Sequence, residues 1–149
     1  MALKERLTQD MQAAMKAGDK PRLSVLRMAL AGVKQREVDT RRPLDDAGVT
    51  SVIERMIKQG RDSAGQYRDG GRAELAEKEE FEIKVLQTYL PQPLTDAELD
   101  TLIVESIDAA NAMSVKDLGK VMAVIKTRAA GRVDMSTISA RVRAMLTPE

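Results

Sequence analysis

Apolar residues recur along this chain at spacings of three and four, which is the period of a helix with one buried face. Seven stripes of this kind can be followed through the sequence. No stretch shows the two-residue alternation that is typical of a half-buried strand. Glycines and prolines separate the stripes, because neither residue continues a helix easily. The pattern therefore predicts an all-α protein.

Four of the predicted helices fall within residues 1–90 and are expected to form an N-terminal domain. Their apolar stripes run through Leu3, Leu7, Met11 and Ala14, then Leu23, Leu26, Leu30 and Val33, then Val49, Ile53, Met56 and Gly60, and finally Ala76, Ile83, Leu86 and Leu90. The expected boundary residues are Gly18, Asp19, Pro43, Asp45 or Asp46, the Gly70-Gly71 pair and Arg72. Aspartate can accept hydrogen bonds from the free N–H groups that begin a helix, and glycine suits a helix end.

The segment Pro91-Gln92-Pro93 is the clearest domain boundary, because two prolines in three residues cannot continue a helix and stiffen the joint. Three short helices are expected after it, in a C-terminal domain over residues 95–149. Thr95 and Glu98 have the spacing of a capping box, in which each side chain accepts a hydrogen bond at the start of the first of these helices. The remaining boundaries are expected at Ser114, Gly131 and Asp134. The predicted architecture is thus a four-helix domain, a proline linker and a small three-helix domain.

Composition removes several kinds of chemistry. The 149 residues include no Cys and no His, so a thiolate, the commonest general base and the commonest metal ligand are all absent. No serine lies in a glycine-flanked elbow, and no glycine-rich phosphate loop occurs. We therefore expect no catalytic residue, no cofactor and no metal site. With no Trp, one Phe and two Tyr, the usual aromatic platform for single-stranded RNA is also missing.

Two absences bear on the cellular location. The first residues, MALKERL, are charged from the fourth position and do not resemble a secretory signal. No apolar run approaches the roughly 18 residues that a membrane span requires. These features lead us to expect a soluble, cytoplasmic protein with no membrane partner.

The net charge of +1 conceals an uneven distribution of charge along the chain. Residues 1–72 carry a net charge of +5, residues 73–108 carry −8, and residues 109–149 carry +4. Within the acidic block, five glutamates fall in nine positions: Glu74, Glu77, Glu79, Glu80 and Glu82. They form either a solvated helix face or an acidic strip that pairs with a basic partner or with the chain's own basic helices, and the sequence leaves these interpretations open.

Seven basic residues in the last block are candidates for binding RNA. They are Lys116, Lys120, Lys126, Arg128, Arg132, Arg141 and Arg143. A solvated surface is one interpretation, and contact with several phosphates is the other. Gly119, next to Lys120, would let either a neighbouring helix or a phosphate approach the backbone closely.

Glu79 lies in the apolar stripe of the fourth predicted helix, where a charge is unexpected. It can reach water from the edge of the stripe, or it can meet a cation. If the third and fourth helices are antiparallel, Arg61 lies roughly opposite residues 79–82. An Arg61–Glu79 ion pair between the two helices is therefore a second possibility.

Four segments resemble the GatB/YqeY family. They are RLSVLR at residues 22–27, MIKQGRDS at 56–63, YLPQPL at 89–94 and GKVM at 119–122. The segments occur in order, and the resemblance covers essentially the whole chain. It implies an all-α protein whose C-terminal domain is similar to the tail of GatB, one of the polypeptides of the glutamine-dependent tRNA amidotransferase. In that enzyme the tail helps to hold tRNA.

The resemblance also bears on individual residues and on activity. It implies an RNA-facing role for Lys120 and for the basic loop at residues 128–132. The family label implies carbon–nitrogen ligase activity with glutamine as the amide donor, yet the catalytic cradle of GatB and the amidase polypeptide of that enzyme have no counterpart in this chain. The leading hypothesis is an accessory RNA-associated protein that binds tRNA. The alternatives are a protein-interaction adaptor and an amidotransferase in its own right.

Overall fold

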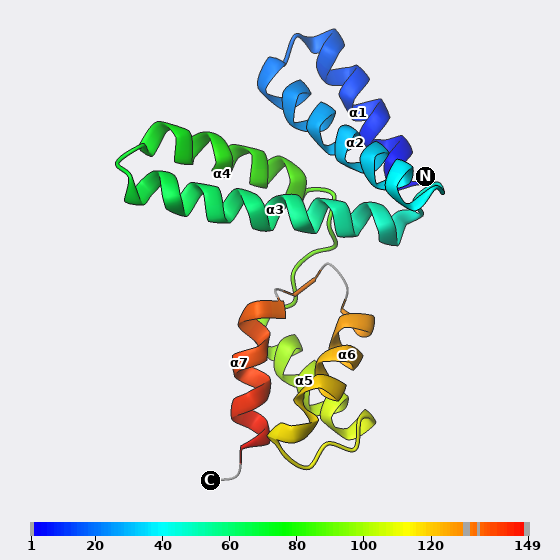
Figure 1. Ribbon diagram of the computed structural model, residues 1–149, viewed down its shortest axis with the longest axis vertical. Coiled ribbons are helices and arrows are strands. Elements are labelled where there is room, and N and C mark those ends of the chain that lie inside the picture. Colours follow the sequence, from blue (N-terminus) through cyan, green and yellow to red (C-terminus); the bar gives the residue numbers. More distant parts are fainter. Residues whose placement is uncertain (1, 130–131, 134, 148–149) are drawn as a thin grey trace. The chain divides into compact units, whose positions relative to one another are not determined.

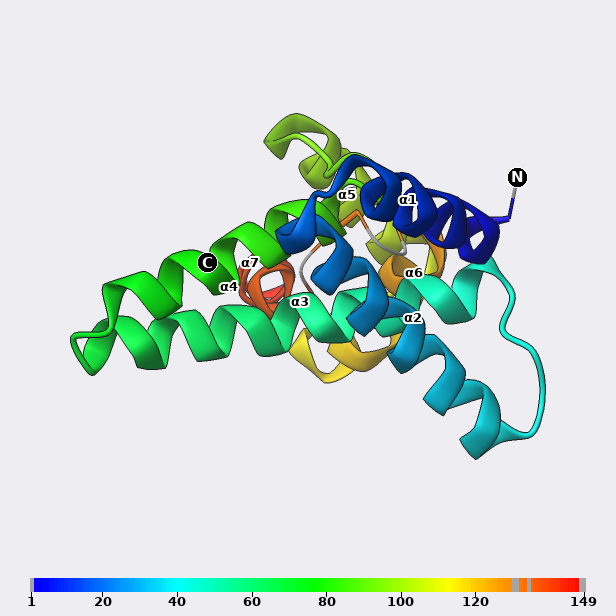
Figure 2. The same ribbon diagram turned by 90° about the horizontal axis from the view of Figure 1, so that it is seen from above.

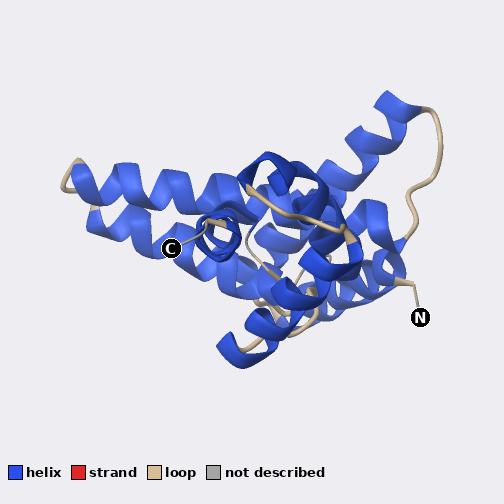
Figure 3. Cartoon of the chain, turned by 90° about the horizontal axis from the view of Figure 1, so that it is seen from below, coloured by secondary structure: helices blue, strands red, loops and turns tan. Residues whose placement is uncertain are grey.

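The computed structural model describes residues 2–129, 132–133 and 135–147, and all their regular structure is helical (Figures 1 and 3). Seven α-helices and one turn of 3-10 helix occur in these residues, with no strand. The prediction of an all-α protein is confirmed. Contacts along the chain divide it into two compact units, residues 1–90 and residues 91–149.

The first unit contains two helical hairpins. Its helices are α1 (Leu3–Ala17), α2 (Lys20–Thr40), α3 (Asp46–Asp69) and α4 (Ala73–Gln87). The α1–α2 hairpin packs on the α3–α4 hairpin mainly through α2, and the two hairpins cross (Figures 1 and 2). The core between them includes Leu7, Leu26, Val33, Val49 and Ile53, each fully buried. These residues belong to the stripes that helical spacing predicts.

Local hydrogen bonds explain where these helices begin and end. Gly18 adopts the left-handed conformation that ends α1, with φ at 71°. Asp19 caps α2, because its carboxylate accepts a hydrogen bond from Arg22 N at 3.3 Å. Asp45 caps α3 through Gly48 N at 2.9 Å, which decides between the two candidate aspartates. Asp46 instead accepts from Leu3 N at 2.9 Å and ties the start of α1 to α3.

The end of α4 differs from the sequence expectation. The helix stops at Gln87, so Leu90 lies in the turn that follows it, although it still packs against the core. Tyr89 is the buried residue of this turn, and its hydroxyl donates to Asp10 Oδ2 at 2.5 Å. Arg6 lies over the same ring, 4.7 Å from its centre, and donates to Thr88 O at 3.2 Å. These contacts fasten the end of α4 to α1.

The second unit is a small bundle formed by α5 (Asp96–Ala109), the 3-10 turn η1 (Val115–Asp117), α6 (Leu118–Arg128) and α7 (Met135–Leu146). Its core consists of Ile103, Val121, Ile125, Ile138, Val142 and Leu146. The capping box at Thr95 and Glu98 is present, with both hydrogen bonds at 3.2 Å. The boundaries expected at Gly131 and Asp134 lie outside the described residues.

The start of α6 corrects one sequence expectation. Ser114 caps η1 rather than the helix itself, because its hydroxyl accepts from Lys116 N at 3.3 Å. The α-helix begins four residues after Ser114, at Leu118. A Ser cap signals a helical start in the sequence, but it does not distinguish a 3-10 turn from an α-helix.

Candidate nucleic-acid interface

The packing of α6 determines which of its basic residues face water. Val121 and Ile125 are fully buried, and this fixes the rotation of the helix about its axis. Lys116, on η1, and Lys120, on α6, are both exposed. Lys120 has only one weak partner, the carboxylate of Asp117 at 3.8 Å, and its side chain is 73% exposed. Both ammonium groups are therefore available to a phosphate.

Two further cations follow in the last turn of α6. Lys126 and Arg128 are exposed, and within the described part of the chain no carboxylate pairs with either. Cations at a helix C-terminus also stabilise the helix, because its last carbonyl groups carry a partial negative charge. Arg143 on α7 is likewise exposed and forms no ion pair with a described residue.

Arg132 and Arg141 make contacts inside the unit. Arg132 Nε donates to Gln92 O at 2.8 Å, and its guanidinium lies 3.8 Å from Glu98. Arg141 contacts Asp96 at 3.3 Å and Asp100 at 2.5 Å, which joins α7 to α5. Sequence reasoning missed these pairings because the partners are about 40 residues apart. Both side chains hold the unit together. The charge of Arg141 is compensated by two aspartates, whereas Arg132 has one carboxylate partner at the longer distance of 3.8 Å.

The backbone beside Lys120 is open. A Cβ atom built on Gly119 would meet no atom within 4 Å, so no neighbouring helix approaches there. The sequence suggested that either a neighbouring helix or a phosphate approaches this backbone. Within the described residues no helix packs there, so the interpretation that remains is access for a ligand.

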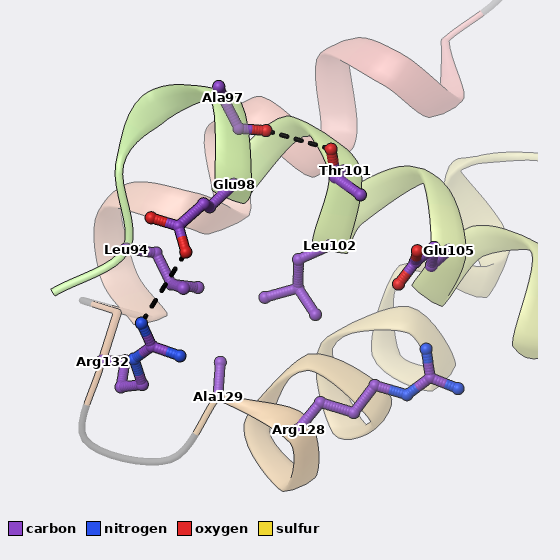
Figure 4. A pocket seen from close by; sticks show the side chains of 9 residues that line it. All are labelled: Leu94, Ala97, Glu98, Thr101, Leu102, Glu105, Arg128, Ala129 and Arg132. Atoms are coloured by element: carbon purple, nitrogen blue, oxygen red, sulfur yellow. Dashed lines mark hydrogen bonds and ion pairs between the residues drawn. The ribbon is translucent and has the colours of Figure 1, made fainter. Parts of the chain in front are cut away.

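A groove of about 400 Å³ separates α5 from the end of α6 (Figure 4). Its apolar surface comes from Leu94, Leu102 and Ala129. Figure 4 shows acidic side chains on the α5 side of the groove and arginines on the opposite side. The full lining is Leu94, Ala97, Glu98, Thr101, Leu102, Glu105, Arg128, Ala129 and Arg132. Only two of these, Arg128 and Arg132, were among the candidate residues from the sequence.

The carboxylates of the second unit are held in their charged form where hydrogen bonds reach them. Hydrogen bonds from the Thr95 backbone and side chain, helped by the charge of Arg132, lower the pKa of Glu98 below its ordinary value. The N–H of Met113 lowers the pKa of Asp117, and Lys120 adds to the effect. These groups are therefore acceptors and charges at neutral pH rather than proton donors.

The acidic face of α4 is partly neutralised by α3. Arg68 donates to Glu80 Oε1 through Nε at 3.0 Å and through its terminal nitrogen at 2.5 Å. This ion pair raises the pKa of Arg68. Glu74 and Glu77, by contrast, lie exposed near the start of the helix. Arg68–Glu80 thus joins these two helices.

Glu79 and Glu82 line a second groove, of about 140 Å³, in the first unit. Burial raises the pKa of Glu82, and the neighbouring Glu79 carboxylate raises it further. Glu79 is half-buried, and Arg61 is exposed on α3. The Arg61–Glu79 ion pair stays a prediction.

The described residues contain neither a metal-binding cluster nor a membrane-spanning helix. No group of three or more acidic side chains is arranged there to hold a metal ion. None of the helices in residues 2–129, 132–133 and 135–147 is both long and apolar enough to cross a membrane.

Comparison with known proteins places the chain in a family. The model of the family described as "Yqey-like protein" matches residues 4–146, almost the full length. This chain belongs to the YqeY family. The resemblance seen in the four sequence segments is therefore confirmed at the level of the family.

Curated relatives of this YqeY-family chain are named "Altered inheritance of mitochondria protein 41, mitochondrial". The protein of Lachancea thermotolerans is 31% identical over 121 residues, which are 76% of this chain and 65% of the relative. That of Eremothecium gossypii is 33% identical over 62% of this chain and 51% of the relative. That of Pyrenophora tritici-repentis is 29% identical over 93% and 77%. The chain thus spans less than two thirds of the first two relatives.

The expectation of a cytoplasmic location is wrong by this comparison, because the relatives are named as mitochondrial proteins. The expectation rested on the lack of a secretory signal and of a membrane span. Neither absence distinguishes one aqueous compartment from another.

Proposed function

We propose that this protein is an accessory RNA-binding protein that holds tRNA through its C-terminal unit. The observation that carries the proposal is a set of exposed cations on η1, α6 and α7 that have no strong partner. They are Lys116, Lys120, Lys126, Arg128 and Arg143. Cations of this kind bind RNA by displacing the counterions that surround its phosphates.

The distribution of charge within the unit limits how RNA can lie on it. Residues 91–149 contain seven basic and eight acidic residues, so the unit as a whole does not attract a polyanion. Helix α5 has five acidic residues and no basic one. The phosphates would therefore follow η1, α6 and α7, and they would keep away from the outer face of α5.

Gly119 supports the same arrangement. The open space beside its backbone lets a phosphate come close to Lys120 without a steric clash. Lys116 and Lys120 are both exposed and only four residues apart, so we propose that both reach one strand of RNA.

The role proposed is binding and not amide transfer. A chain without Cys and His lacks the residues that most often activate glutamine or carry an acyl group. We therefore expect the purified protein to show neither glutaminase activity nor transfer of an amide to misacylated tRNA. Steady turnover that one point substitution abolishes would contradict this part of the proposal.

The two compact units are proposed to be separate domains, a four-helix one and a three-helix one, joined by a linker around Pro91-Gln92-Pro93. The contact boundary after Leu90 supports this division. The linker residues 91–93 are exposed.

The test of RNA binding is a titration of the full chain with a tRNA transcript across a series of salt concentrations. If several phosphates are engaged, the logarithm of the association constant falls against the logarithm of salt with a slope of about −3 or steeper. A chain that does not bind tRNA at low salt would contradict the proposal.

One observation favours a second candidate, the protein-interaction adaptor. The groove beside α4 combines apolar side chains, among them Met28 and Met56, with the half-buried carboxylates of Glu79 and Glu82. A basic side chain with an apolar stem has the complementary chemistry. Failure of tRNA binding would make this the leading function.

A further inference from the structure

We infer that the groove between α5 and the end of α6 takes up a single unpaired guanine of the bound RNA, with Glu105 and Arg128 as the residues that select it. This inference rests on the proposed RNA-binding function and assigns it a base preference. It concerns the nine residues that line the groove in Figure 4.

The floor of the groove suits the flat face of a base. Leu102 is half-buried and Ala129 is buried at 2% exposure, so a firm apolar surface lies between the two helices. Leu94 closes one end, and its position is fixed because its N–H donates to Arg132 O at 3.1 Å. RNA-binding proteins often read bases that have left the helical stack, and they usually stack them on aromatic rings. This chain has few aromatic residues, and the groove offers aliphatic surface instead.

The polar groups on the two sides of the groove differ in how far they are already engaged. Glu98 is occupied by the capping box and by the charge of Arg132. Glu105 and Arg128 are exposed, and no ion pair joins them to each other or to another described residue. Figure 4 shows the guanidinium of Arg128 extending toward the part of the groove where Glu105 lies. A ligand between them would meet a strong acceptor on one side and a strong donor on the other.

Guanine matches this pair better than the other bases do. Its pairing edge presents two adjacent donors, N1–H and the N2 amine, next to the O6 acceptor. Two carboxylate oxygens can accept from both donors while an arginine donates to O6, and arginine is the commonest partner of that atom in nucleic-acid complexes. Uracil has one donor between two carbonyl oxygens, and these would be repelled by Glu105. Adenine and cytosine each offer one exocyclic amine beside a ring acceptor.

Arg132 is placed to hold the phosphate of the same nucleotide. Its hydrogen bond to Gln92 O fixes the guanidinium at the edge of the groove. A fixed guanidinium loses little freedom when it binds a phosphate, and its planar donors suit phosphate oxygens. Although α5 is acidic, RNA can therefore approach this helix at the groove, where Arg128 and Arg132 lie opposite it.

The experiment measures binding of the full chain to three RNA heptamers by fluorescence anisotropy at low salt. All positions are uridine except the central one, which is guanosine, adenosine or uridine. We expect the guanosine heptamer to bind at least about fivefold tighter than the uridine heptamer. In the Glu105→Gln variant the preference should disappear, while affinity for the uridine heptamer stays the same or rises because one negative charge is gone.

A matched control separates recognition from charge. Asp108→Asn also removes an exposed charge from α5, but this residue does not line the groove, so the guanosine preference should remain. If the chain binds tRNA yet binds the three heptamers equally or not at all, the guanine site is wrong and the proposed function stands. If neither tRNA nor any heptamer binds, the proposed function is wrong as well.

Discussion

Gly60 shows how one residue sets the distance between two helices. It is buried in α3, and a Cβ atom there would lie 3.1 Å from Ile83 Cγ1 on α4. Gly65 is in the same helix and is exposed, with no atom within 4 Å of its Cβ position. The two glycines therefore have different roles, as expected from the apolar stripe, which includes Gly60 and not Gly65.

Substitution of the two glycines should have opposite effects on stability. Gly60→Val forces α3 and α4 apart and should lower the free energy of unfolding by about 1–3 kcal/mol. Gly65→Ala should raise it by up to about 1 kcal/mol, because alanine is the better helix former and meets no clash. Urea unfolding followed by circular dichroism measures both. Equal effects of the same sign would contradict the close packing at Gly60.

Glu82 makes stability depend on pH in a defined direction. Its pKa is raised in the folded protein by burial and by Glu79, so the folded state holds this proton at a higher pH than the unfolded chain does. The ionised side chain therefore destabilises the fold at neutral pH. This effect fades as the pH falls through the raised pKa, and it is gone below the ordinary glutamate value. Nearby Lys78 opposes the shift without cancelling it.

The Glu82→Gln variant should accordingly have a higher melting temperature than the wild type at neutral pH. The difference should shrink toward zero in acid, where Glu82 is protonated in both states. Glu77→Gln serves as the control, because Glu77 is exposed on the same helix and should change the melting temperature little. A constant difference across the pH range would exclude Glu82 ionisation as its cause.

At the scale of single residues, the sequence predicted the caps and most of the buried stripe. Asp19, Asp45 and Thr95 act locally, through backbone N–H groups three residues away, so their types and spacing were sufficient. Tyr89 could not be placed in the same way. Its burial depends on Asp10 and Arg6, which are brought to it only when α1 packs on the end of α4.

Among the helices, α7 carries two arginines with different roles: Arg141 contacts another helix, and Arg143 is a candidate for binding RNA. Arg141 contacts Asp96 and Asp100 on α5, whereas Arg143 is exposed and forms no ion pair with a described residue. Ion pairs at a surface contribute up to about 1 kcal/mol. The charge of Arg141 is thus used between helices, and that of Arg143 is directed to solvent.

Arg141→Met should lower the free energy of unfolding by up to about 1 kcal/mol and change tRNA affinity little. Arg143→Met should leave stability within about 0.5 kcal/mol and weaken tRNA binding. Urea unfolding and the tRNA titration distinguish the two. An exchange of these effects between the arginines would contradict the assignment.

The order and approximate bounds of the helices were predictable, because each helix has its own apolar stripe and its own capping, glycine or proline residues at its ends. The pairing of helices was not. Arg61–Glu79, the contact between α3 and α4 that the sequence suggested, stays a prediction. The structure shows a different ion pair that the sequence did not suggest, Arg68–Glu80 near the Gly70-Gly71 turn. The identity of such a pair depends on the axial position of one helix against the other.

At the scale of the whole molecule, the proposed linker should be the first place that a protease cuts. Residues 91–93 are exposed and lie at the boundary between the two compact units. Limited digestion with a protease of broad specificity, followed by mass spectrometry, should give a first cut between Leu90 and Thr95. A first cut inside α3 or α4 would contradict the division into domains.

The candidate site was only partly predictable on this scale. The seven cations could be read from the sequence, but their availability could not. Arg132 and Arg141 are engaged by residues about 40 positions away, and Glu105 lines the groove because α5 packs against α6. Net charge per segment hides such compensation, since it counts charges without their partners.

Whether the C-terminal unit holds tRNA is tested by comparing the salt dependence of tRNA binding between two triple variants. The first is Lys116→Gln, Lys120→Gln and Lys126→Gln; the control, Lys16→Gln, Lys34→Gln and Lys58→Gln, removes exposed lysines of the other unit. Each phosphate that a variant no longer neutralises should reduce the steepness of the logarithmic slope by about 0.7–0.9. We predict a reduction of about 2 or more for the first variant and an unchanged slope for the control. An unchanged slope in the first variant, with a reduced one in the control, would show that the C-terminal unit does not hold the RNA.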